Sequence, residues 1–192
     1  MSAPEAERTP QTSAAAEQAP PAGATAERAP SGLVLRPAHP DEYDLIGELT
    51  VTAYVGGGFV DAGSDYVPTL RDSATRSKEA ELLVAELDGT IVGTVTYSPG
   101  GGAYSNIGDA EDAEFRMLAV ATSARGRGVG AALVRLCVDK ARAAGCTALR
   151  LSTQTDMVAA QRLYRRLGFV RTPERDWRLS SGFTLITYAL PL

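Results

Sequence analysis

The sequence predicts an α/β fold in which helices pack against a mixed β-sheet. From residue 33 onward, segments rich in β-branched and aliphatic residues alternate with segments of helical periodicity, which is typical of α/β domains. Asp88-Gly89 separates two β-rich runs, and this dipeptide is a strong signal for a two-residue hairpin, so part of the sheet is antiparallel. An apolar run ending at Val120 leads through a glycine-rich turn into a helical segment, which indicates a strand–turn–helix unit.

The chain of 192 residues divides into a tail and one domain. Residues 1–32 consist almost entirely of Ala, Pro, Glu, Thr, Gln, Ser, Gly and Arg. Such a segment buries too little apolar surface to offset its ordering entropy, so we expect a disordered N-terminal tail. Residues 33–192 are enough for one domain with a hydrophobic core.

Each element of the domain has a local signal. Residues 33–37 form a short apolar strand, and Pro40 with two following acids begins a helix, because proline and negative charge suit a first helical turn. A turn at 54–63 precedes a second helix over 67–79. The remaining expected elements are hairpin strands 82–87 and 90–97, strand 114–120, helix 129–144, strand 147–152, helix 157–167 and strands 169–172 and 183–189.

Composition argues against several functional classes. No run reaches the 18 apolar residues of a membrane span, and the N-terminal segment resembles neither a signal nor a transit peptide, so we expect a cytoplasmic protein with no membrane partner. A formal net charge of −4, with no basic cluster outside the glycine-rich turn, argues against nucleic acid as a partner. The single histidine, His39, suits a loop or helix cap, and Cys137 and Cys146 suit buried free thiols, so no metal is expected.

The segment Arg125-Gly126-Arg127-Gly128-Val129-Gly130 before Ala131 is suited to binding a phosphate group. Glycine allows the backbone to approach an anion closely, and the first turn of the following helix has N–H groups without intrahelical partners. A nucleoside triphosphate loop would need a lysine after its glycines, and none is present. Gly126-x-Gly128-x-x-Ala131 fits a loose dinucleotide pattern, but too few residues follow for the further βαβ units, so an NAD-type protein is a disfavoured alternative.

Arg125-x-x-Gly128-x-Gly130 at a strand-to-helix junction resembles the Gln/Arg-x-x-Gly-x-Gly/Ala signature of the GNAT superfamily of acetyltransferases. Upstream, residues 114–120 are similar to the strand that binds pantetheine in that family. Downstream, residues 159–169 are similar to its tyrosine-bearing helix and Leu-Gly-Phe exit. The resemblance implies a GNAT-like central sheet, mixed but mostly antiparallel and flanked by helices, with a splayed pair of parallel strands that binds CoA.

The resemblance also implies an N-acetyltransferase that transfers the acetyl group of acetyl-CoA to a primary amine by direct attack in a ternary complex. The β-strand backbone would pair with pantetheine, the turn amides would take the pyrophosphate, and a backbone N–H near Leu118 would stabilise the developing oxyanion. The implied CoA-binding residues are Leu118, Ala119, Val120, Arg125, Gly126, Arg127, Gly128, Val129, Gly130 and Ala131.

Two residues are candidates for proton transfer. Tyr164 matches the family's general acid, which protonates the leaving thiolate; a packing tyrosine on an amphipathic helix is the alternative. Glu114 is the best candidate for the base, because strand alternation places it on the same face as Leu118 and Val120. Glu111 and Asp112 are nearby alternatives, and a strand-entry carboxylate that faces water or pairs with Arg116 is an equally good reading of Glu114.

One position departs from the family pattern. Met157 stands where the family often has an asparagine that hydrogen-bonds pantetheine, so this contact is missing or comes from Gln154 or Thr155. The departure leaves a non-catalytic acyl-CoA-binding or regulatory domain as the alternative to an enzyme. Trp177 lies in a region that borders the acceptor site in this family, where it either walls the pocket or caps the edge of the core.

The acceptor amine is not specified by the sequence. A small molecule and a peptide both fit, and acids such as Asp61 and Asp65 could attract a cationic amine or belong to an ordinary acidic surface. A homodimer is common among members of the family.

Overall fold

The computed structural model of the chain describes residues 30–102, 104–178 and 184–192. The tail predicted for residues 1–32 lies almost wholly outside these ranges. In chain order the elements are β1 (Leu33–Pro37), the 3₁₀ helix η1 (Pro40–Glu42), α1 (Tyr43–Val55), α2 (Val67–Arg71), α3 (Ser73–Glu79), β2 (Glu81–Leu87), β3 (Thr90–Pro99), β4 (Ala113–Val120), the 3₁₀ helix η2 (Thr122–Ala124), α4 (Val129–Ala143), β5 (Ala148–Gln154), α5 (Val158–Arg166), β6 (Val170–Arg171), the 3₁₀ helix η3 (Pro173–Arg175), β7 (Trp177–Arg178) and β8 (Thr184–Pro191).

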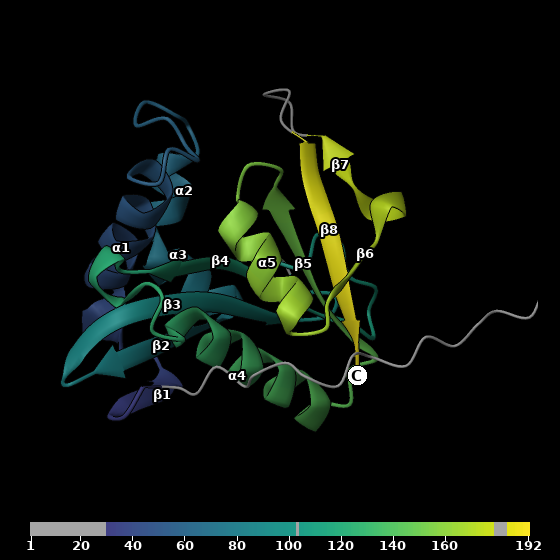
Figure 1. The fold of residues 1–192 in the computed structure, drawn as a ribbon, viewed down its shortest axis with the longest axis horizontal. Coiled ribbons are helices and arrows are strands. Elements are labelled where there is room, and N and C mark those ends of the chain that lie inside the picture. The colour runs from purple at the N-terminus through teal and green to yellow at the C-terminus, as the bar shows by residue number, and fades with distance from the viewer. Residues whose placement is uncertain (1–29, 103, 179–183) are drawn as a thin grey trace, which may run out of the picture.

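One mixed sheet organises these strands in the order β1-β2-β3-β4-β5-β8-β6, with β7 alongside β8 (Figure 1). Every neighbouring pair is antiparallel except β4 and β5, which are parallel. The parallel pair is joined only at Ala113–Leu149 and Glu114–Arg150 before the strands part. The predicted α/β class, the mostly antiparallel sheet and the splayed parallel pair are confirmed.

Helices cover both faces of the sheet (Figure 1). The α4 helix packs on the face that carries Val95 and Tyr97 of β3, and its Val129 and Leu133 lie against Gly93, where a Cβ would meet them at 2.9 and 3.1 Å. The alternate β3 residues turn to the other face, on which α1 and α3 lie. Period-2 alternation in β3 therefore assigns its side chains to two packed layers.

The segment predicted as one helix over 67–79 is two short helices, which corrects that expectation. The backbone breaks at Asp72, whose side chain accepts a hydrogen bond from Thr75 N and so caps the start of α3. The Arg76 guanidinium, 1% exposed, donates to the carbonyls of Thr69 and Leu70 at the end of α2. The sequence pattern continues across this break with helical spacing, because α2 and α3 bury the same side.

Several other local predictions are confirmed. Asp88 and Gly89 both have positive φ, as a two-residue hairpin turn requires. His39 is the N-cap of η1, where Glu42 accepts from its backbone N–H. Cys137 is a buried free thiol, and Cys146 is free but only half-buried. Over the described ranges, no helix has the length and apolar character that crossing a bilayer takes.

Candidate active site

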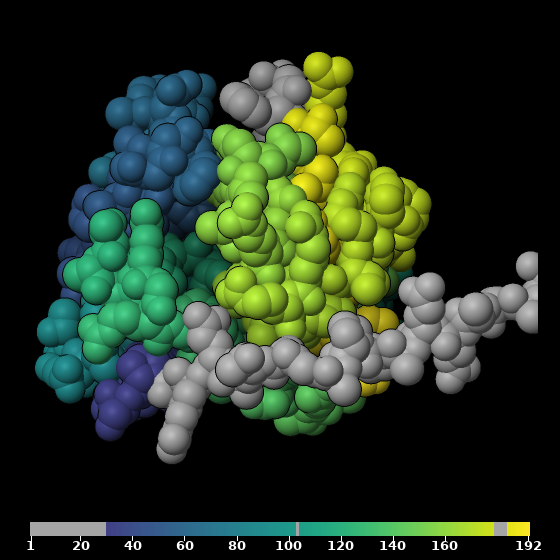
Figure 2. Space-filling view, viewed as in Figure 1, coloured from purple at the N-terminus to yellow at the C-terminus, as the bar shows by residue number. Residues whose placement is uncertain are grey.

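Two adjoining cavities lie where β4 parts from β5. In Figure 2 the surface is hollowed between the blue α1–α3 segment and the yellow-green α5. The first cavity, of about 510 Å³, is lined by β4, the glycine-rich turn, the end of β5 and one side of α5. Nine of the ten residues expected to bind CoA line it, and Tyr164 joins them; Arg127 does not. The sequence-predicted donor site is therefore brought together as one cavity.

The glycine-rich turn forms one end of the first cavity. Gly126 and Gly128 have φ values of +73° and +80°, a region that strains any residue with a side chain. Gly128 is the N-cap of α4, and no side chain caps this helix start. The N–H groups of the first turn of α4 therefore face the cavity end without an intrahelical acceptor, which is the arrangement that binds an anion.

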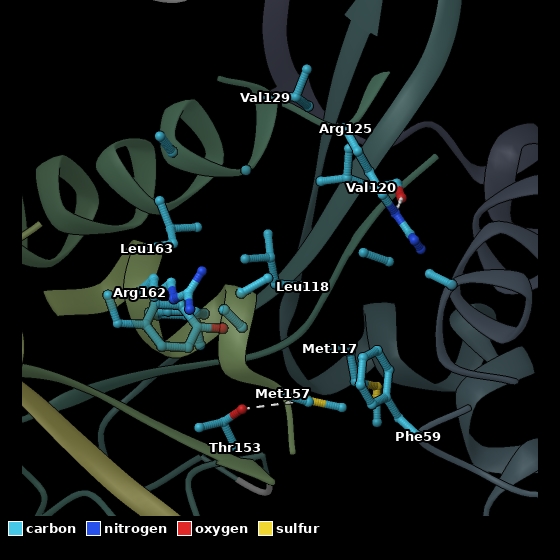
Figure 3. A pocket seen from close by; sticks show the side chains of 18 of the residues that line it. Phe59, Met117, Leu118, Val120, Arg125, Val129, Thr153, Met157, Arg162 and Leu163 are labelled. Carbon is cyan, nitrogen blue, oxygen red and sulfur yellow. Dashed lines mark hydrogen bonds between the residues drawn. The ribbon is translucent and has the colours of Figure 1, made fainter. Parts of the chain in front are cut away.

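A β-bulge divides the side chains of β4 between the two faces of the sheet. Thr94 pairs with Ala119 and Thr96 pairs with Arg116, so two β4 residues, Met117 and Leu118, lie opposite one β3 residue. Met117 has φ +53°, which is rare for a residue with a side chain. In Figure 3, Met117 lies beside Phe59 while Leu118 lies nearer Leu163 of α5.

The bulge overturns the alternation argument for Glu114. One extra residue shifts the pattern, so Leu118 and Val120 share a face with Phe115, whereas Glu114 points to the opposite face. The Glu114 carboxylate is fully buried, accepts hydrogen bonds from the N–H groups of Asn106 and Ile107, and lines neither cavity. Burial raises its pKa. The structure does not bring Glu114 together with Tyr164.

The two alternative carboxylates are also away from the opening. Asp112 is buried in a bridge to Arg150 and accepts from Thr147, so it ties β4 to β5 below the splay. Glu111 lines neither cavity. Its backbone carbonyl accepts a hydrogen bond from Thr147 N, just before β5.

Tyr164 stands on α5 and reaches the first cavity from an aromatic cluster. Its ring is 5% exposed and lies edge-on to Phe115 at 5.8 Å, with Phe169 and Tyr188 at 6.0 and 6.2 Å. In the described part of the chain, no group accepts a hydrogen bond from its hydroxyl. Burial raises the pKa of this phenol above its usual 10, so it keeps its proton throughout the neutral range.

Two arginines of α5 are site residues that the sequence reasoning missed. Arg162 and Arg166 line the first cavity together with Arg125. They project from the helix one turn apart, at a spacing of four residues, which is the signal that could have found them. Together with Arg116, which also lines this cavity, they make four guanidinium-bearing residues, and such a set favours a ligand with several negative charges.

The second cavity, of about 800 Å³, adjoins the first across β4. Loop 58–66 forms much of its lining, with the end of β5 and residues of β7 and β8. Trp177 belongs to this lining. Of its two expected positions, in the wall of a pocket or at the edge of the core, this is the first. The residues that line both cavities are Tyr54, Phe59, Arg116, Met117, Ser152, Thr153 and Met157.

Neither expected substitute for the missing asparagine is placed to serve the first cavity. Gln154 donates its side-chain N–H to the Phe59 carbonyl at 3.0 Å and lines the second cavity, and Thr155 lines neither. Thr153 lies nearer, with its hydroxyl 3.3 Å from Met157 Sδ (Figure 3). Among the described residues, no three His, Cys, Asp or Glu side chains gather as a metal site would need.

Comparison with known proteins agrees with this geometry. Residues 46–169, well over half of the chain, match the family model for the acetyltransferase (GNAT) family. The chain belongs to the GNAT family of acetyltransferases. The matched range runs from α1 to the Leu-Gly-Phe exit of α5, so it contains β4, the glycine-rich turn and Tyr164.

Individual GNAT relatives are distant. Mycothiol acetyltransferase from Nocardia farcinica is 32% identical over 148 residues, which is 77% of this chain and 43% of that protein. The chain spans less than half the length of the curated relatives it matches. A GCN5-related N-acetyltransferase from Kribbella flavida has a TM-score of 0.62 at 28% identity, covering 85% of this chain and all of the other. A GNAT acetyltransferase from Brucella melitensis in complex with acetyl-CoA has a TM-score of 0.56 at 22% identity, covering 83% and 88%.

Proposed function

We propose that this chain transfers the acetyl group of acetyl-CoA to a primary amine, by direct attack of the amine in a ternary complex. The observation that carries the proposal is the meeting of two cavities at β4, one ending in an anion-binding turn and the other open to a second molecule. Membership of an acetyltransferase family supports acyl transfer. The acetyl-CoA bound to the Brucella melitensis relative supports the donor.

The first cavity fits acetyl-CoA. Beyond Glu114, β4 has no partner strand on the β5 side, so its backbone groups from Leu118 to Val120 are available to a pantetheine amide. The space around Gly126 is open where a Cβ would stand, and the first-turn amides of α4 suit a pyrophosphate. Arg125, Arg162 and Arg166 would face its phosphates. When bound, acetyl-CoA supplies a thioester that a neutral amine can attack and a thiol leaving group.

Two groups of this chain would assist the transfer. The bulge turns the backbone at Met117 and Leu118, and an N–H there would donate to the carbonyl oxygen as it gains negative charge, an effect worth roughly 10²–10³ in rate. The Tyr164 hydroxyl holds a proton that it can give to the leaving sulfur. Both groups are fixed before the reaction by packing, so little reorganisation is needed.

No carboxylate base stands at the junction of the cavities. Within the described ranges, the residues that line both cavities include no aspartate or glutamate. Asp61, Asp65 and Asp156 line the second cavity alone, so the amine would lose its proton there, to solvent or to one of these carboxylates. An amine with a pKa near 8 meets a smaller penalty at neutral pH than an alkylamine with a pKa near 10.4, about 1–2 against 4–5 kcal/mol.

The test is release of free thiol from acetyl-CoA in the presence of a panel of amines, with the acetylated product identified by mass. An enzyme releases thiol only with an accepted amine and yields one acetylated product per thiol. A non-catalytic acyl-CoA-binding domain would bind acetyl-CoA, measured by calorimetry, and release no thiol with any amine.

A further inference from the structure

Arg116 is the one arginine among the described residues that lines both cavities. It lies on β4 next to the bulge, on the face shared with Met117. Only 17% of its side chain is exposed. No described residue accepts a hydrogen bond from this guanidinium, and its ion-pair partner Glu114 keeps an Oε1–Nε distance of 3.9 Å, beyond hydrogen-bonding range.

Such a guanidinium is poorly satisfied by the protein itself. Its five N–H donors lie in one plane and are available to an acceptor that a ligand supplies. A carboxylate matches two of these donors at once, with charge-assisted bonds. Glu114 is held by the N–H groups of Asn106 and Ile107 and does not close on Arg116. The free donors therefore favour an anionic group of a bound ligand.

We propose that the acceptor is an α-amino carboxylate, held with its carboxylate on Arg116 and its amine toward the opening between β4 and β5. This inference rests on the proposed function. One carbon atom separates the two groups of an α-amino acid, so a carboxylate anchored at the junction of the cavities also brings the amine to that junction. The side chain of the acceptor then extends into the second cavity.

The remaining lining of the second cavity limits that side chain. Its other charged residues in the described part of the chain are Asp61, Asp65 and Asp156. Three carboxylates disfavour a second negative charge on the acceptor and favour a neutral or basic side chain. The aromatic lining residues, Tyr54, Phe59, Tyr66 and Trp177, offer faces for an apolar or cationic group.

Two matched series of acceptors test the proposal. The first series is L-leucine, L-leucinamide and 3-methylbutylamine, and the second is L-arginine, L-argininamide and agmatine. Within each series the side chain and the amine are the same, and the carboxylate is kept, converted to an amide or removed. We expect kcat/KM from thiol release to be about 10- to 100-fold higher for each amino acid than for its amide or its decarboxylated amine, as loss of a charged hydrogen-bond pair predicts. L-glutamate should be a poorer acceptor than L-leucine.

Arg116→Gln and Arg116→Lys separate recognition from folding. Arg116→Gln should abolish the preference for L-leucine over L-leucinamide, and Arg116→Lys should keep part of it, because the charge remains and the planar fork does not. Arg162→Gln, in the first cavity only, should raise the KM for acetyl-CoA and leave the preference intact. An unchanged Tm in thermal unfolding shows that each variant is folded.

Each outcome decides the matter. Amides and decarboxylated amines that react as well as the amino acids would overturn the carboxylate assignment while leaving the acetyltransferase proposal standing. An equal loss of rate toward all acceptors in Arg116→Gln would make the residue structural. Acetyl-CoA binding without thiol release for any amine would overturn the proposed function, and this inference with it.

Discussion

Replacing Tyr164 by phenylalanine separates its proposed catalytic role from its packing role. The ring is 5% exposed and contacts Phe115 and Phe169, and phenylalanine keeps those contacts. Because no described group accepts a hydrogen bond from the hydroxyl, its removal orphans no buried partner. We therefore expect the free energy of unfolding to change by less than about 1 kcal/mol.

The rate should respond differently. If the hydroxyl gives its proton to the leaving sulfur, kcat should fall about 10²-fold, which is about 2.7 kcal/mol of barrier. The KM for acetyl-CoA should change less than threefold (~0.65 kcal/mol), because the ring that lines the first cavity remains. Steady-state thiol release at varied acetyl-CoA, with thermal unfolding of the same preparation, gives both quantities.

Tyr188→Phe is the matched control. Tyr188 is 1% exposed, neighbours the Tyr164 ring at 6.2 Å and lines neither cavity. Its hydroxyl contacts Gln161 and Arg165 at 3.4 Å, so this variant should lose some stability and keep its kcat. An unchanged kcat in Tyr164→Phe would refute the proton-donor role, and equal losses in both variants would assign the effect to packing of the cluster.

Three further predictions follow from the backbone and from the pKa of Tyr164. Gly128→Val should raise the KM for acetyl-CoA at least tenfold (~1.4 kcal/mol), since φ is +80° at the helix start; an unchanged KM in the thiol assay would contradict the phosphate-cradle role. Gly47→Ala should lower the free energy of unfolding by about 1–3 kcal/mol, because a Cβ would lie 2.1 Å from the Arg71 carbonyl oxygen. Gly63→Ala is the control, since the space around Gly63 is open, and it should leave the Tm unchanged. Equal Tm values for the two variants would refute the close contact. Log kcat/KM should rise with pH as the amine loses its proton and show no falling limb below about pH 10, because burial raises the pKa of Tyr164; a falling limb centred near pH 8 would exclude Tyr164 as the acid.

Agreement between sequence and structure is best where a signal lies within one element or turn. The Asp88-Gly89 hairpin, the α4 start after Gly128 and the α5 helix with Tyr164 agree in type and place. Each depends on contacts among neighbouring residues. The break at Asp72 escaped prediction because α2 and α3 bury one common side, and only their junction, held by Arg76, separates them.

The candidate donor site could be read from the sequence because its parts, residues 114–131 and 159–169, are short continuous segments with their own spacing. The acceptor side could not. Its lining comes from Tyr54, loop 58–66, the end of β5, Trp177 and Leu185, which only the folded sheet brings together.

The sequence by itself determined most of the order of the elements, the glycine-rich turn and the tyrosine-bearing helix that follows it, since these rest on local periodicity and on glycine's freedom in φ. The tertiary structure decided which way β4 presents its side chains. Met117 adopts φ +53° while packing in a cluster with Val51, Val67 and Leu70, and the resulting bulge turns Glu114 away from Leu118. That single inserted residue depends on pairing with β3 and on packing from α1 and α2, which no window of sequence contains. It removes the expected base from the site and leaves Arg116 at the junction of the cavities.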